Sequence, residues 1–96
     1  KRQGNNLYIN AKIDLYTAVL GGSVTLDTLS GKVKLNIKPG TQNGSTVKLK
    51  GKGFPVYKKE GQFGDLFVTW DVKLPEKISE KEKALFTELK KLHDEK

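Results

Sequence analysis

The chain has 96 residues, 35% of them hydrophobic and 30% charged, which suits one small domain with one modest core. It contains no cysteine, so disulfides and thiolate zinc sites are excluded. The formal net charge of +7 is unevenly placed: residues 1–58 hold ten basic and two acidic side chains, whereas residues 59–96 hold eight and nine. No apolar run approaches membrane-spanning length, so we expect no membrane partner.

The chain is predicted to begin with a strand and a short helix. Residues 7–13 alternate apolar and polar side chains, which is typical of a half-buried strand. Asp14 is then expected to cap a helical turn over residues 15–20. The glycine pair at 21–22 ends that turn.

Three more strands are predicted in the middle of the chain. One begins at residues 24–26 and reverses at Ser30-Gly31 into a second strand over residues 32–37. Pro-Gly and Asn-Gly turn signals within residues 38–44 lead to a further strand over residues 45–50, because proline presets φ and glycine accepts positive φ.

A loop, a strand and a helix complete the prediction. Four glycines and one proline in residues 51–64 indicate an ordered loop. Residues 65–74 alternate cleanly, placing Trp70 in the core, and Pro75 stops this strand. Ser79 with Glu82 forms a capping box for a helix from Glu80 to about His93. Four residues give that helix one apolar stripe: Leu85, Phe86, Leu89 and Leu92.

The fold class that follows is mainly β: a small β-sandwich or distorted barrel with one short internal helix and a C-terminal amphipathic helix. Its lysines alternate with apolar residues, so they share the face opposite the core: Lys32, Lys34, Lys38, Lys48, Lys50 and Lys52. This pattern is typical of a solvated sheet face, but it also suits an acidic partner such as nucleic acid or an acidic peptide.

No group of residues predicts catalysis, a metal or a cofactor. His93 is the only histidine, and it lies near a helix end where its charge would suit the helix dipole. Asp65 is expected to cap a turn by accepting hydrogen bonds from backbone amides. Gly51-Lys52-Gly53 lacks the spacing of a phosphate-binding loop. The chain is therefore predicted to be a binding domain and not an enzyme.

Three ordered motifs carry a family resemblance over nearly the whole chain. Residues 38–54 resemble the Pro-Gly-Thr and Gly-Lys-Gly signature of the C-terminal substrate-binding domains of DnaJ co-chaperones. Residues 14–22 and 64–68 match the same family in the same order, and residues 74–86 resemble the entry to its dimerisation helix. Trp70 departs from the pattern, because the family more often has an aliphatic residue there.

The resemblance implies a piece of a longer cytoplasmic protein of the zinc-free branch. In this family tandem β-domains bind unfolded polypeptides, a C-terminal helix forms a homodimer, and a separate J domain serves delivery to a heat-shock ATPase. Residues 1–75 would then be a peptide-binding β-domain and residues 76–96 the dimerisation helix. Some bacterial members of that branch bind DNA, so a DNA-binding module that uses the basic strand face is the alternative function.

Two candidate sites follow. An apolar groove between the short helix and the next strand would take an extended peptide, because residues 14–26 carry more apolar side chains than one buried face requires. Its predicted residues are Leu15, Tyr16, Val24 and Leu26. The helix stripe must be covered either by its own sheet or by a second copy. The resemblance favours the second copy, with Leu85, Phe86, Leu89 and Leu92 as the dimerisation residues.

Overall fold

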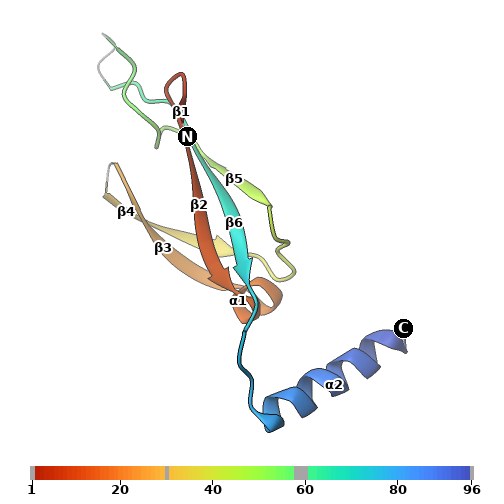
Figure 1. Ribbon diagram of the computed structural model, residues 1–96. Helices are drawn as coiled ribbons and strands as arrows, with labels where there is room; N and C mark the ends of the chain where they lie inside the picture. The colour runs from red at the N-terminus through yellow and green to blue at the C-terminus, as the bar shows by residue number, and fades with distance from the viewer. Residues whose placement is uncertain (1, 30, 58–60, 96) are drawn as a thin grey trace.

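The chain folds into two β-sheets packed face to face, with one helix between strands and one helix at the C-terminus (Figure 1). The computed structural model describes residues 2–29, 31–57 and 61–95. Within these residues the strands form an open sandwich and do not close into a barrel. The predicted mainly β fold with a short internal helix and a C-terminal helix is confirmed.

The four-stranded sheet has the strand order β1-β2-β6-β5, and the two-stranded sheet pairs β3 with β4. In chain order the elements are β1 (Arg2–Gln3), β2 (Asn6–Asp14), α1 (Leu15–Leu20), β3 (Gly22–Thr28), β4 (Gly31–Ile37), β5 (Thr46–Leu49), β6 (Leu66–Lys73) and α2 (Glu80–Asp94). Ser30 of the predicted hairpin turn and residues 58–60 of the predicted loop lie outside the described residues.

The centre of the fold is the parallel pairing of β2 with β6. The pairing begins with Leu7 opposite Leu66 and ends with Asp14 opposite Lys73. All the intervening chain, including α1, the β3–β4 hairpin and β5, is therefore a crossover between these two strands. The antiparallel strand β5 then pairs along the other edge of β6.

The core lies between the two sheets. Alternate residues of β2, β6 and β4 meet there, and one residue of α1 joins them. The buried members are Ala11, Ile13, Ala18, Leu35, Ile37, Leu66, Val68 and Trp70. Trp70 is only 3% exposed, which confirms its predicted place in the core.

Local capping residues set the helix ends as predicted. The Asp14 carboxylate accepts a hydrogen bond from the Thr17 amide at 2.7 Å, and α1 ends at Gly21, whose φ is +86°. At α2 the Ser79 hydroxyl accepts from the Glu82 amide, while the Glu82 carboxylate accepts from the Ser79 amide. These reciprocal bonds form the predicted capping box.

Truncating the buried first residue of β6 is expected to destabilise the domain. Leu66 is 0% exposed, so Leu66→Ala removes buried methyl groups and leaves a cavity, at a cost of about 2–5 kcal/mol. Leu74→Ala is the matched control, since Leu74 lies just beyond the same strand and is 69% exposed. In urea denaturation, the unfolding midpoint of the first variant should lie far below that of the parent, and the midpoint of the second should lie close to it. Equal midpoints for the two variants would contradict this core assignment.

Candidate functional site

The C-terminal helix α2 presents an uncovered apolar stripe. The segment from Leu74 to Ser79 is exposed and carries the chain away from the end of β6 (Figure 1). No described residue of α2 is buried, and Leu85, Leu89 and Leu92 are each more than half exposed. An amphipathic helix normally covers such a stripe by packing. The stripe is thus an apolar surface that the fold leaves open.

A groove lies between this stripe and α1. Tyr16 of α1 faces Phe86 of α2, with their ring centroids 6.3 Å apart and their planes inclined by 34°. The groove has a volume of about 320 Å³ and is lined by Tyr16, Glu82, Leu85, Phe86, Glu88, Leu89 and Leu92. All four predicted dimerisation residues therefore line one groove. The sequence pattern assigned Tyr16 to the peptide site instead, and it gave no role in a groove to Glu82 and Glu88.

The four residues predicted to bind peptide fall into two environments. Tyr16 is 47% exposed and belongs to the groove beside α2. Val24 and Leu26 lie on β3 opposite Leu35 and Val33, and both are half-buried against the core. Leu15, at the start of α1, is also half-buried. A peptide groove that these residues share stays a prediction, although Tyr16 is the member most open to a ligand.

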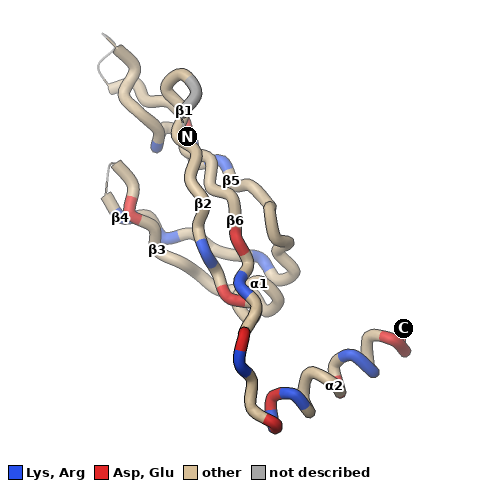
Figure 2. Tube along the Cα trace, in the orientation of Figure 1, with Lys and Arg blue, Asp and Glu red and all other residues tan. Residues whose placement is uncertain are grey.

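The lysines do not form one face. Lys32 and Lys34 lie on β4 in the two-stranded sheet, whereas Lys48 lies on β5 in the four-stranded sheet and Lys50 directly follows it. All four are exposed, as predicted. Because the two sheets bury their facing sides, their outer sides point in different directions. Basic residues are accordingly spread over the domain, with acidic residues among them (Figure 2).

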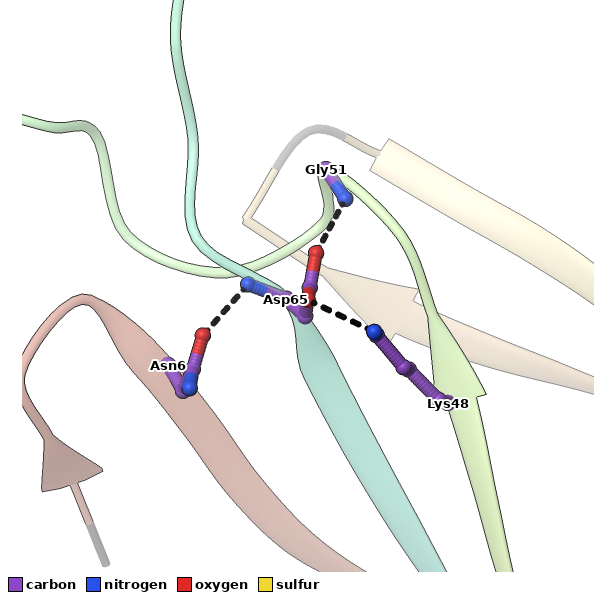
Figure 3. A network of polar contacts seen from close by, with 4 residues as sticks. All are labelled: Asn6, Lys48, Gly51 and Asp65. Atoms are coloured by element: carbon purple, nitrogen blue, oxygen red, sulfur yellow. Dashed lines mark hydrogen bonds and ion pairs between the residues drawn. The ribbon is translucent and has the colours of Figure 1, made fainter.

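A network of polar contacts around Asp65 stabilises the end of the domain at which β6 begins (Figure 3). One Asp65 carboxylate oxygen accepts from the Gly51 amide at 3.0 Å, and the other lies 3.4 Å from the Lys48 ammonium. The Asp65 amide donates to the Asn6 side-chain oxygen at 2.8 Å. The Asp65 carboxylate accepts from a backbone amide as predicted, but this amide belongs to Gly51, fourteen residues away in sequence. The Gly51 amide, together with Lys48, lowers the pKa of the Asp65 carboxyl below its usual value.

Close backbone packing explains two glycines of this region. Gly64 and Gly53 both lie against the Asn5 carbonyl group, where a β-carbon would overlap backbone atoms. The Phe54 amide donates to the same Asn5 oxygen at 2.8 Å, and Gly53 donates to Gly64 at 2.9 Å. At this end of the domain the glycines therefore allow backbone segments to pack closely.

Other kinds of site find no support in the described part of the chain. Residues 2–29, 31–57 and 61–95 contain no group of three His, Cys, Asp or Glu side chains placed to hold a metal ion. Within the same ranges, neither helix is long and apolar enough to span a membrane. The arrangement defines a class: a small β-sandwich with an outlying amphipathic helix whose apolar stripe is open.

Comparison with known proteins makes the family explicit. Residues 1–75 match the family model described as the DnaJ C terminal domain, and the chain belongs to this family. It is 46% identical over 95 residues to the "Chaperone protein DnaJ" of Caldicellulosiruptor bescii. The aligned region covers 99% of this chain and 24% of that protein. The protein of the same name from Dictyoglomus thermophilum is 42% identical and covers 96% of this chain.

One relative, from Arabidopsis thaliana, is named as a mitochondrial protein. The "Chaperone protein dnaJ 1, mitochondrial" is 40% identical, over 94% of this chain and 22% of that protein. The chain thus spans about a quarter of the length of the relatives it matches. The family resemblance predicted from the motifs is confirmed, whereas the zinc-free branch and a cytoplasmic location stay predictions.

The Asp65 network is expected to make stability depend on pH. Because the folded-state pKa of Asp65 is lowered, its contribution is present above the unfolded-state pKa and is lost as pH falls through the folded-state value. Asp65→Asn removes that titration and the ion pair, while retaining an oxygen for Gly51. The stability advantage of the parent over this variant should be largest at neutral pH and shrink below the usual value of 3.8.

Urea denaturation of both proteins across this pH range measures the difference. Asp14 and Glu82 also have lowered pKa values, through hydrogen bonds from Thr17 and Ser79, but they occur in both proteins and cancel. A stability difference that does not change with pH would show that the charge of Asp65 contributes nothing.

Proposed function

We propose that this chain is the client-binding and dimerisation part of a DnaJ-type co-chaperone. The observation that carries the proposal is the open apolar stripe of α2 in a chain of this family. Residues 1–75 would form the peptide-binding domain, and residues 76–96 would form the dimerisation helix. Delivery of clients to a heat-shock ATPase would belong to the whole protein. The chain would act by binding and not by catalysis.

The exposed stripe supports a second copy of this chain as the partner of α2. Complete burial of a leucine or phenylalanine side chain is worth roughly 1.5–3 kcal/mol, so a stripe of four such residues gains considerably from being covered. In the single chain, α2 remains without a buried residue among those described, even though Phe86 meets Tyr16. A twofold axis would double the stripe and cover both copies with the same surface.

The client site is proposed along α1 and β3, from Leu15 and Tyr16 to Val24 and Leu26. Tyr16 supports this placement because nearly half of its surface is open. An extended polypeptide could pair its backbone with a strand edge and place alternate side chains against this apolar end of the domain. The exposed lysines are divided between the two sheets, so no observation favours the alternative DNA-binding function.

Dimerisation is expected to depend on the stripe and not on the opposite face of α2. Leu89→Asp places a charge in the groove, whereas Thr87→Asp places the same charge two residues away, outside the residues that line it. Sedimentation at tens of micromolar should show a dimer for the parent and for Thr87→Asp, and a monomer for Leu89→Asp. A parent protein that sediments as a monomer would refute the proposed dimer.

Client binding can be located with a photo-crosslinking tyrosine analogue. Placed at position 16, it should label an extended apolar peptide. Placed at position 57, at the far end of the domain, it should label much less, even though Tyr57 is 81% exposed. Because both positions hold tyrosine, the comparison separates location from simple exposure. Equal or stronger labelling at position 57 would argue against the site along α1.

A further inference from the structure

The turn before β5 contains an Asn43-Gly44 sequence that is exposed on the surface. The Asn43 side-chain oxygen accepts a hydrogen bond from the Val72 amide at 2.9 Å. The Gly44 amide donates to the Trp70 carbonyl oxygen at 2.8 Å, and the Trp70 amide donates to Ser45 at 2.8 Å. These bonds extend the pairing of β5 with β6 beyond Thr46 and fix both halves of the Asn-Gly unit on β6.

This unit is a potential site of spontaneous deamidation. The Gly44 nitrogen can attack the side-chain carbonyl carbon of Asn43, which forms a cyclic imide and breaks the bond to the side-chain nitrogen. That nitrogen leaves as ammonia and carries away the Gly44 amide proton. One water molecule then opens the ring at either carbonyl group, giving aspartate or isoaspartate. Glycine at the second position favours the attack, because no side chain shields its nitrogen.

We infer that Asn43 is a latent deamidation site that docking of the 43–45 turn on β6 keeps unreactive. The attacking nitrogen is the one whose hydrogen is held by the Trp70 carbonyl, so it must leave that bond before it loses its proton. The Val72 contact acts differently: it draws electrons from the Asn43 amide, and on its own it would favour attack. Protection therefore rests on the Gly44 bond and on the fixed position of the Asn43 side chain.

Opening of the β5 end would release this protection. The turn lies at the edge of the four-stranded sheet, where local opening requires far less free energy than global unfolding. Conversion to isoaspartate inserts a methylene into the main chain between residues 43 and 44. It would shift the Gly44 amide away from the Trp70 carbonyl, so a molecule that has opened and reacted should not close in the same register.

The experiment compares deamidation in the folded chain, in the urea-unfolded chain and in a synthetic peptide of residues 40–48. All three are incubated in the same mildly alkaline buffer, with the peptide measured with and without urea. Peptide mapping by mass spectrometry follows the exchange of ammonia for water at residue 43. Asn43→Gln is the control that separates this signal from Asn5, Asn6, Asn10 and Asn36, since glutamine forms the larger ring slowly.

The folded chain should react at least about tenfold more slowly than the peptide, because the Gly44 hydrogen bond to Trp70 must break and the fixed Asn43 side chain must reorient before attack. The unfolded chain should match the peptide. Hydrogen exchange of the Gly44 amide should be slowed in the folded chain, and the isolated isoaspartate product should unfold at lower urea than the parent. A folded chain that deamidates at the peptide's rate, or a Gly44 amide that exchanges as fast as in the peptide, would overturn the inference.

Discussion

The parallel pairing of β2 with β6 is the constraint on which the rest of the structure depends. It joins an early and a late strand of the chain, in register from Leu7 and Leu66 to Asp14 and Lys73. A parallel pair needs a crossover, so α1, the hairpin and β5 must be placed between its two halves. The side chains of β6 are the most deeply buried in this arrangement: Leu66 and Val68 are fully enclosed, and Trp70 is nearly so.

The register of this pair also determines what meets at each end of the domain. At one end Asn6 lies beside the start of β6, so that its side chain reaches the Asp65 amide and the backbone of Asn5 meets Gly64. At the other end Asp14 lies opposite Lys73, so α1 begins where the chain leaves toward α2. The contact of Tyr16 with Phe86 follows from this shared end. One end is thus closed by backbone packing, while the other leaves apolar side chains open.

Features set by neighbours in sequence were predictable, while those set by pairing were not. The Asp14 cap, the Ser79 capping box, the burial of Trp70 and the stripe of α2 each follow from residue type and local period, and the structure contains all four. The parallel partner of β2 has no local signal, because alternation gives a strand's face and not its neighbour. For the same reason the alternation predicts one lysine face and is wrong, because β4 and β5 belong to different sheets.

The distribution of burial separates the elements that form the core from the helix that does not. The eight buried hydrophobic residues among those described lie in α1, β2, β4 and β6, and no described residue of α2 is buried. The helix begins with a complete capping box and carries acidic residues at its start and basic residues near its end, so its own local interactions stabilise it. Its leucines are therefore not required by the core of the single chain. A helix that is locally stabilised, joined by an exposed segment and apolar on one side has the properties expected of a contact surface, since covering its stripe would add stability only when a partner is present.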